Sequence, residues 1–154
     1  MLLEILQREK MMSESNSVDQ HMIDLDEDPY IPFHWKIEEH IHGGQFEWDS
    51  AKVVLYLSLY QQSRGTIEGN QLREELKGRL VYNANLLDYL LENPQFVPEE
   101  WKGKRVHFWG TIYRDGNDNL VVRFLDWHDN RWRPLYRLLD ASFNAANPAA
   151  ISRD

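Results

Sequence analysis

The residues best suited to metal chemistry are two histidines separated by one position, in the run EEHIH at residues 38–42. In an extended strand, His40 and His42 point to the same side, where both imidazoles could share a metal ion. A metal site needs at least one further ligand, and no spacing in the sequence identifies one. We therefore expect no metal site and interpret the run as a solvated acidic arm, with metal binding by the two histidines as the open alternative.

Signatures of other catalytic chemistry are missing from the sequence. It has no cysteine, and hence neither a thiolate nucleophile nor a disulfide. A GxSxG elbow, a phosphate-binding loop, an HExxH helix and a dinucleotide fingerprint are all absent. The carboxylate pairs Glu74-Glu75 and Glu99-Glu100 consist of adjacent residues, whose side chains diverge on a helix and cannot act on one bond. We expect that the protein is not an enzyme and needs no cofactor.

Aromatic and arginine side chains concentrate in the last third of the chain. Three runs of strand-like composition cover residues 105–114, 120–127 and 131–139, separated by turn-forming residues. Such a succession predicts an antiparallel β-meander. Pro134 has no N–H to donate to a ladder, which predicts that the third strand lies at an edge.

Side chains alternate between the two faces of a strand, so residue parity assigns each of them to a face. Even-numbered positions of the three runs are mostly apolar and should face the core, whereas the odd-numbered face is aromatic and basic. We predict that this second face binds a ligand, because tryptophan, tyrosine and arginine are enriched at binding hot spots. The candidate site residues are Trp109, Tyr113, Arg123, Trp127, Arg131 and Arg133. Two other interpretations are open: the side chains only stabilise the sheet across strands, or the acidic tail of the protein covers them.

Helical signals precede the strands. A leucine stripe follows Asn83, which is a suitable N-cap, and ends before Pro94. The run at residues 49–62 has a capping signal as well as a two-residue alternation, and we favour a helix over a strand there. The other expected helices cover residues 70–77 and 83–92, with a short helical turn at 98–101. The expected fold class is α+β, with about three short helices packed on a three-stranded antiparallel β-meander, and an additional N-terminal strand is left open.

Composition and charge divide the chain into segments. We expect a disordered acidic tail at residues 1–28, one α+β domain at 29–140 and a C-terminal loop at 141–154. Residues 1–100 carry 8 Lys and Arg against 19 Asp and Glu, whereas residues 101–139 carry 8 against 4. The net charge of −8 disfavours nucleic acid as a partner. Without a signal peptide or an apolar run of membrane-spanning length, we expect a cytoplasmic protein with no membrane contact.

Three motifs carry a resemblance to other proteins. They are NANLLDYLL at residues 83–91, PEEWKGK at 98–104 and FWGTIYR at 108–114. With these motifs the chain resembles a group of small uncharacterised bacterial proteins over roughly two thirds of its length. In that group the strands after FWGTIYR vary in aromatic and small polar residues, and a sequence like Pro148-Ala149-Ala150 often follows. This pattern is similar to the variable target proteins of diversity-generating retroelements, which implies diversified ligand contacts. The resemblance carries no catalytic residues over to this chain.

Together these patterns favour a non-enzymatic binding module whose aromatic–arginine sheet face meets a protein or another macromolecule. Two alternatives belong to other classes. The acidic residues 1–100 would suit a decoy or inhibitor that mimics nucleic acid in a mobile-element conflict. The aromatic face would suit a sheet that binds single-stranded nucleic acid. The sequence leaves the oligomeric state open.

Overall fold

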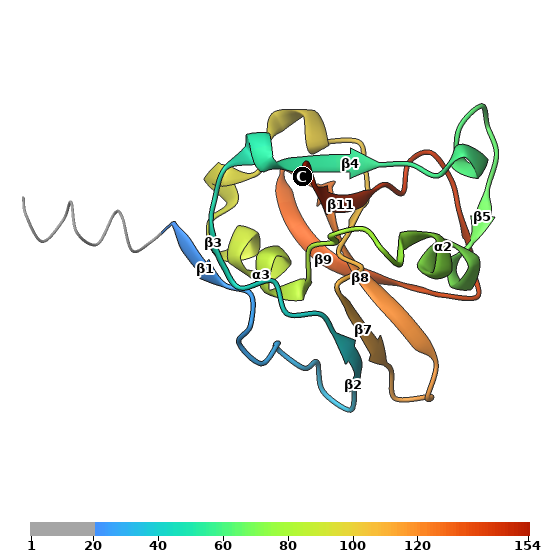
Figure 1. Ribbon diagram of the computed structural model, residues 1–154, viewed down its shortest axis with the longest axis horizontal. Helices are drawn as coiled ribbons and strands as arrows, with labels where there is room; N and C mark the ends of the chain where they lie inside the picture. Colours follow the sequence, from blue (N-terminus) through green and yellow to red (C-terminus); the bar gives the residue numbers. More distant parts are fainter. Residues whose placement is uncertain (1–20) are drawn as a thin grey trace, which may run out of the picture.

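The computed structural model describes residues 21–154, which Figure 1 shows in sequence colours. In this part of the chain, a curled seven-stranded sheet is accompanied by two two-stranded sheets and two α-helices. Residues 1–20 of the predicted acidic tail lie outside the described residues. Residues 22–24, from the same predicted tail, form a strand that pairs with residues 45–47. The ordered domain therefore begins earlier than the predicted boundary at residue 29.

The elements are short and follow one another closely along the chain. The strands are β1 (Met22–Asp24), β2 (Lys36–His40), β3 (Gln45–Glu47), β4 (Val53–Tyr56), β5 (Ile67–Glu68), β6 (Val106–His107), β7 (Thr111–Arg114), β8 (Leu120–His128), β9 (Arg131–Leu138), β10 (Ser142–Phe143) and β11 (Ala149–Ser152). The α-helices are α2 (Gly69–Leu76) and α3 (Ala84–Glu92). Single 3₁₀ turns are η1 (Ser50–Lys52), η2 (Leu59–Gln61), η3 (Pro94–Phe96) and η4 (Glu99–Trp101).

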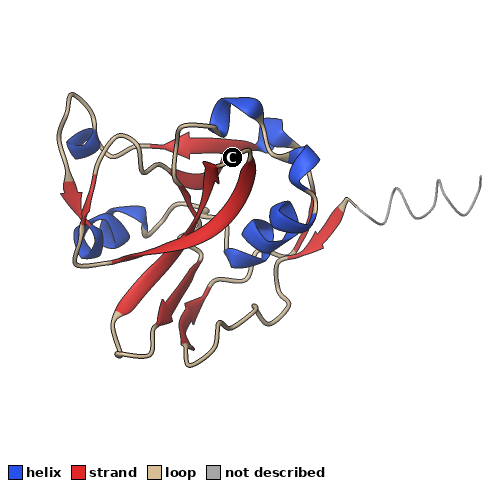
Figure 2. Ribbon diagram, turned by 180° about the vertical axis from the view of Figure 1, so that it is seen from behind, coloured by secondary structure: helices blue, strands red, loops and turns tan. Residues whose placement is uncertain are grey.

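The long strand β8 organises the seven-stranded sheet, which Figure 2 shows from behind. One edge of β8 pairs with β9 from Val121 to His128. The other edge pairs first with β7 and then with β6. Beyond this edge the sheet divides, because β7 continues to β2 whereas β6 continues to β11 and then to β4. The parallel pairing of β11 with β6 makes the sheet mixed.

The predicted arrangement of about three short helices on a three-stranded meander is wrong. Strands β7, β8 and β9 do pair in succession, but they belong to a sheet that also contains β2, β4, β6 and β11. The described residues form two α-helices and are richer in strand than in helix. The fold does mix α and β structure, as the sequence predicted. As expected from Pro134, β9 is an edge strand, with β8 as its one partner among residues 21–154.

The predicted helix at residues 49–62 is replaced by the two 3₁₀ turns η1 and η2, with the strand β4 between them. The capping signal is genuine but local, because the Asp49 carboxylate accepts a hydrogen bond from the Ala51 N–H and the turn ends at Lys52. The following run VVLY contains two β-branched residues and pairs with β11. Strand propensity and pairing with β11 therefore outweigh the helix cap in this segment.

The predicted C-terminal loop at residues 141–154 contains β10 and β11. Strand β11 lies inside the sheet, between β6 and β4. Its residues Ala149 and Ala150 contact the cores on opposite faces of the sheet, and both are buried. A strand buried on both faces does not alternate between apolar and polar residues, which is why this run of small residues did not look like a strand.

The two helices that the leucine patterns predicted are confirmed at α2 and α3. As predicted, Asn83 caps α3, since its side chain accepts a hydrogen bond from the Asn85 N–H. Leu86, Leu87 and Leu90 are fully buried under the sheet. The proline-led turn predicted at residues 98–101 is η4.

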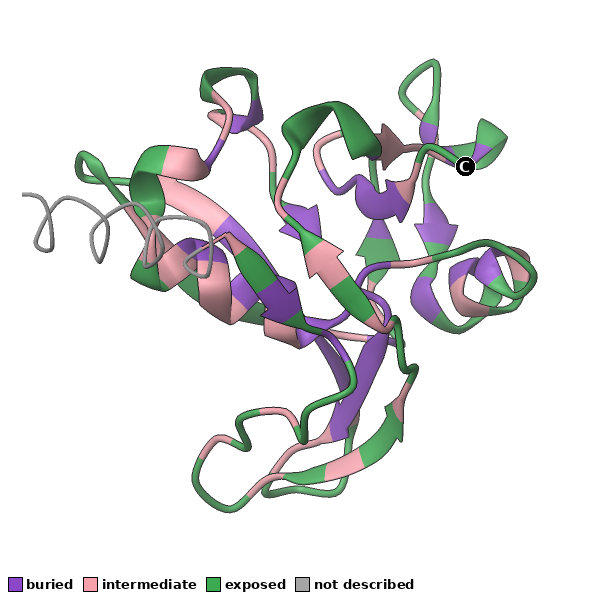
Figure 3. Cartoon of the chain, turned by 60° about the vertical axis from the view of Figure 1, so that its left-hand side comes forward, coloured by how far each residue is buried: buried purple, intermediate pink, exposed green. Residues whose placement is uncertain are grey.

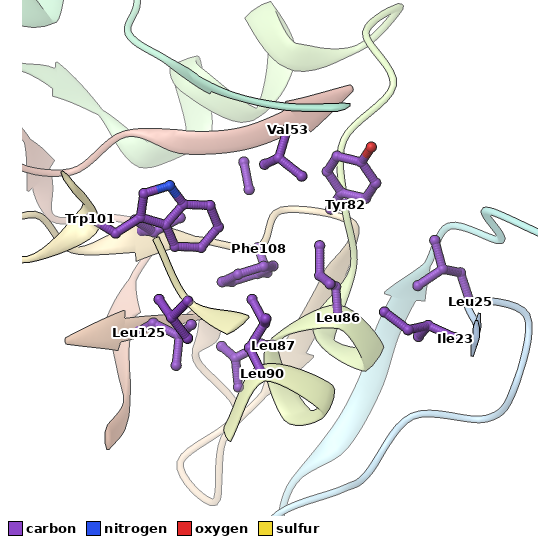
Figure 4. Packing of buried hydrophobic residues seen from close by; sticks show 13 residues of the cluster. Ile23, Leu25, Val53, Tyr82, Leu86, Leu87, Leu90, Trp101, Phe108 and Leu125 are labelled. Carbon is purple, nitrogen blue, oxygen red and sulfur yellow. The ribbon is translucent and has the colours of Figure 1, made fainter. Parts of the chain in front are cut away.

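Both faces of the central sheet are covered. On one face, α3 packs its leucines against Phe108 and Leu125 in the cluster that Figure 4 shows. On the other face, α2 joins Val122 and Phe143 in a second cluster. Figure 3 shows the result: buried residues run through β7, whereas β2 at the edge consists of exposed and half-buried positions.

A buried polar junction holds α3 to the strands. The Asn83 amide donates hydrogen bonds to the carbonyl oxygens of Leu25 (2.8 Å) and Ile41 (2.9 Å). Gly110 packs against Asn83 so closely that a Cβ atom there would lie 2.7 Å from the Asn83 Cα. Thr111 Oγ1 accepts a hydrogen bond from Ala84 N–H, 2.9 Å away, in the first turn of α3. The helix start, the β1 segment and the β7 strand therefore depend on one cluster of polar contacts.

Replacing Asn83 with Asp should destabilise the fold more than replacing it with Ala. Aspartate keeps the capping oxygen, but it sets a carboxylate against the two carbonyl oxygens that now accept from the amide. We expect Asn83→Asp to lower the free energy of unfolding by about 3 kcal/mol and Asn83→Ala by about 2 kcal/mol in urea denaturation. An Asn83→Asp variant with the same free energy of unfolding as the wild type would show that Asn83 is only a helix cap, because aspartate caps helices as well as asparagine does.

Candidate binding surface at the β8–β9 hairpin

The structure divides the six predicted site residues into a buried and an accessible group. Trp109, Tyr113 and Arg123 are buried, with 3%, 0% and 5% of their surfaces exposed. Trp127 and Arg133 are half-buried, and Arg131 is exposed. The first three belong to the interior and cannot meet a ligand in the folded protein. The other three lie near the turn that joins β8 to β9.

The length of this turn decides which side chains share a face. Asp129 and Asn130 form the turn, with φ angles of 52° and 61° that are typical of type I′ hairpins. His128 therefore pairs with Arg131, across a turn of two residues. Odd-numbered residues of β8 thus lie opposite even-numbered residues of β9, and a parity carried straight across the turn assigns β9 to the wrong faces.

The aromatic and basic side chains of the hairpin consequently lie on opposite faces. Trp127 pairs with Trp132, which the sequence analysis had assigned to the core face. Arg131 and Arg133 lie on the other face, together with Asp126. The predicted single aromatic–arginine face is therefore two different surfaces.

A second parity error arises where the strand before β8 is interrupted. Val106 pairs with Leu125, whereas Tyr113 pairs with Val121. The chain therefore advances seven residues, from 106 to 113, while its partner β8 advances four, from 125 back to 121. The excess of three residues is odd, so the side chains change faces at the break. Trp109 joins the cluster under α2, whereas Tyr113 joins a cluster on the side of α3.

The side of β8 that was predicted to be open is covered by α3 and by the loop before β2. The Arg123 guanidinium donates two hydrogen bonds, each 3.0 Å long, to the two carboxylate oxygens of Asp88 in α3. The Tyr113 hydroxyl donates to the Tyr30 carbonyl oxygen (2.9 Å), and Trp35 packs edge-on against the Tyr113 ring. These contacts hold the helix and the loop on the sheet.

Breaking the Arg123–Asp88 pair should therefore destabilise the protein. Arg123→Ala leaves the Asp88 carboxylate partly buried without its cation, and we expect a loss of about 3 kcal/mol in the free energy of unfolding. The double variant Arg123→Met with Asp88→Leu should recover most of this loss, because it removes both charges and keeps the apolar contacts. Denaturant titrations measure both values. Equal stability of Arg123→Ala and the wild type would place this pair among weak surface ion pairs.

Two of the accessible residues, Trp127 and Arg131, border a groove between the hairpin and the segment after α3, with a volume of about 350 Å³, whereas Arg133 does not line it. The rings of Trp127 and Trp132 meet edge to face, 5.3 Å apart, at its rim. Lys102 places its Nζ 4.0 Å from the centre of the Trp127 ring and also pairs with Glu99 at 2.9 Å. Leu91, Pro94 and Val97 supply apolar walls. The groove thus combines aromatic, cationic and apolar groups that are open to solvent.

Sequence reasoning missed part of this groove. In the sequence, Lys102 belongs to the PEEWKGK motif and carries no functional signal of its own. Residue parity predicts that Trp132 faces the core. A two-residue turn with Asn at its second position is a recognised hairpin signal, and pairing His128 with Arg131 on that basis would have placed Trp132 beside Trp127.

The two candidate metal ligands have separate polar neighbours. His40 Nδ1 lies 2.9 Å from Thr111 Oγ1, and His42 Nδ1 lies 3.7 Å from the Asp26 carboxylate. Burial, and next the proximity of His42, lower the pKa of His40. Residues 21–154 contain no group of three or more His, Asp and Glu placed to hold a metal ion. In the described structure, His40 serves to fix β2 on β7.

His107 is a buried histidine that the sequence analysis did not single out. Its ring stacks on Phe124, with ring centres 4.6 Å apart, and Phe143 contacts it edge-on. Nδ1 lies 2.8 Å from the Arg105 carbonyl oxygen and must carry the ring proton to donate to it. Nε2 is buried without a hydrogen-bond partner among the described residues. Burial lowers the pKa of His107 to about 3, with smaller contributions from neighbouring arginines.

His107 should make the fold sensitive to mild acid. The unfolded chain takes up this proton near pH 6.5 and the folded protein only near pH 3, so stability falls as the pH drops through this window. Between pH 7 and pH 5 we expect His107 to account for a loss of about 2 kcal/mol in the free energy of unfolding. His107→Gln should remove that part of the pH dependence, whereas His128→Gln, which changes an exposed histidine, should retain it.

Titration of the wild-type protein by NMR gives an independent measurement. The His107 ring should keep its neutral Nδ1–H form at pH 5, whatever the stability of the glutamine variant. A His107 ring that becomes protonated near pH 6.5 in the folded protein would contradict this account.

No protein-family model matches the sequence, and no curated protein or solved structure matches it either. Neither helix in residues 21–154 has the length and apolar character that crossing a membrane requires.

Proposed function

We propose that this protein is a non-enzymatic binding module that engages another protein through the tip of the β8–β9 hairpin and the adjoining groove. The accessible Trp127 ring, flanked by Trp132 and by the Lys102 ammonium group, is the observation that supports this function most directly. Tryptophan is among the residues enriched at binding hot spots, and a partner that covers the groove would remove water from this ring. Positioned by a tight two-residue turn, the tip is ordered before a partner arrives, which reduces the entropy lost on binding.

The groove also indicates what kind of partner segment it would accept. Its apolar walls suit an apolar or aromatic side chain, whereas Arg131 at the rim has no carboxylate partner among residues 21–154. An acidic residue next to an apolar one would satisfy both features. The resemblance to variable target proteins also favours a binding role, because the strands that vary in that group correspond to β8 and β9 here.

The nucleic-acid alternatives receive less support. Binding of a single strand needs several aromatic rings and phosphate-binding cations along one surface. The groove brings Lys102 and Arg131 to the tryptophan pair, but Arg133 and Arg137 lie on the opposite face of the hairpin from Trp127. The net charge of −8 also repels a polyanion. The acidic decoy was based on residues 1–100, and no contact in the described residues favours it over the groove.

The proposal is tested by comparing partners captured from a cell lysate by the wild type and by a Trp127→Ala/Arg131→Glu variant. Both changes lie at the accessible tip, so the fold should persist, and urea denaturation should confirm this. We expect one or more partners to be lost, and the affinity of a purified partner to fall at least about 100-fold, since a tryptophan hot spot alone contributes about 2 kcal/mol or more.

A matched control combines Tyr60→Ala with Lys77→Glu. It also removes one exposed aromatic ring and reverses one exposed charge, but both residues lie outside the groove. This control should retain every partner that the wild type captures. Identical partner lists for all three folded proteins, or equal losses from both variants, would refute a binding function of the hairpin tip.

A further inference from the structure

We infer that the face of β9 opposite Trp127 and Trp132 binds acidic peptide segments in an extended conformation. Arg131, Arg133 and Arg137 occupy alternate positions of β9 and therefore point to this one side. Val106 pairs with Leu125 in the antiparallel ladder. The preceding residue, Arg105, therefore comes opposite Asp126 and adds a fourth cation to this side. We call these four residues, Arg105, Arg131, Arg133 and Arg137, the arginine face. Arg131 also borders the proposed groove, but Arg105, Arg133 and Arg137 do not line it, so the inference does not depend on the groove.

Two of the four guanidinium groups are held in fixed orientations. Arg133 donates from Nε and Nη2 to one carboxylate oxygen of Asp126, at 3.1 and 3.0 Å. Arg137 donates from Nε and Nη2 to the Ser142 carbonyl oxygen, and its guanidinium lies 5.2 Å from the centre of the Phe143 ring. A guanidinium has five N–H donors, so each of these groups keeps donors for a further acceptor. Because their rotamers are already fixed, binding a carboxylate would cost little additional side-chain entropy.

The charge on this face is poorly compensated within the described residues. Asp126 is the one carboxylate that pairs with any of the four arginines, whereas Arg105, Arg131 and Arg137 have no ion pair in residues 21–154. Burial, and next the proximity of Arg105, lower the pKa of Arg137. A bound carboxylate would relieve this repulsion between cations. On a chain with a net charge of −8, the arginine face is a local exception to which an acidic segment is complementary.

The spacing of the arginines indicates an extended ligand. Alternate residues of a strand are about 6.8 Å apart, and alternate residues of an extended peptide repeat at the same distance. A peptide that lies along β9 could therefore set a carboxylate against Arg131 and another against Arg133. Leu135, which is 37% exposed, interrupts the series before Arg137 and suits an apolar residue of the ligand. The expected ligand has acidic residues at alternate positions, with an apolar residue opposite Leu135.

Two observations favour acidic side chains over phosphates as the ligand groups. The exposed or half-exposed rings of Trp127, Trp132 and Tyr136 lie on the other side of the hairpin, so a base would find the small His128 ring here rather than a tryptophan or a tyrosine on which to stack. Carboxylates also match the fork of N–H groups on a guanidinium. Pro134 removes the N–H that its position would direct to the open edge of β9, so recognition would depend on side chains more than on an added strand.

The test measures binding of short fluorescent probes to the full chain by fluorescence anisotropy at low ionic strength. A peptide of alternating Glu and Thr should bind saturably. A peptide of the same composition with all Glu in one block should bind about fivefold more weakly, because fewer of its carboxylates can meet the arginines together. A Lys–Thr peptide should not bind, and oligothymidylate should bind more weakly than the Glu–Thr peptide. Absence of saturable binding, equal affinity for the block peptide or tighter binding of oligothymidylate would each overturn the inference.

Variants of the full chain should either weaken or strengthen binding of the Glu–Thr peptide, depending on the charge that they remove. Arg105→Gln and Arg137→Gln should each weaken binding of the Glu–Thr peptide by about fivefold, because each removes one cation from the face. Asp126→Asn should strengthen binding, because it frees Arg133 from its carboxylate partner. Lys77→Gln, which removes one exposed charge on the side of α2, should have no effect, and an effect equal to that of Arg137→Gln would reduce the inference to net charge.

The groove and the arginine face can be tested separately. Trp127→Ala should leave the affinity for the Glu–Thr peptide unchanged, whatever it does to capture of a protein partner. Loss of peptide binding in Trp127→Ala would mean that the peptide occupies the groove, which would overturn a separate site on the arginine face.

Discussion

The fold depends on hydrogen bonds that meet where α3 begins. Thr111 Oγ1 accepts from the Ala84 N–H and contacts His40 Nδ1, while the Asn83 amide bonds two carbonyl oxygens of the segments before β2 and after it. The side chains of Asn83 and Thr111 are buried, so a bond that either of them loses would leave a polar atom without water. The junction thereby fixes the position of one helix relative to the β1 segment, β2 and β7 at once.

The same junction explains why the sheet has two covered faces. At Gly110 the chain passes so close to Asn83 that a side chain does not fit, and the strand from residue 106 to 114 is interrupted there. The interruption lets its first half pair with β11 and its second half with β2, so the sheet divides into two branches. Because side chains also change faces at the break, apolar residues emerge on both sides. A helix on each side is needed to bury them, and α3 and α2 take these places.

The sequence predicted features that depend on neighbouring residues, but it did not predict the register in which the strands pair. The Asn83 cap, the leucine stripe of α3 and the edge position of Pro134 depend on neighbouring residues and were predicted correctly. The faces of β7 and β9 depend on how many residues each turn or bulge contains, and one residue more or less reverses every assignment that follows. Strand β11 was missed for another reason: its small residues have no strand pattern of their own and form a strand because β6 and β4 pair with them.

The same dependence on register determines which candidate site residues could be predicted. Arg123 has the residue type of a binding hot spot, yet α3 supplies Asp88 to it from a distant part of the chain, and this contact left no pattern near Arg123. The hairpin tip is covered only in part: Trp132 packs against the cluster that contains the α3 leucines, whereas the turn residues Asp129 and Asn130 are exposed. A turn of two residues then separates the tip into an aromatic side and an arginine side. The surface chemistry at the tip is thus set by the length of a turn as much as by the residues that flank it.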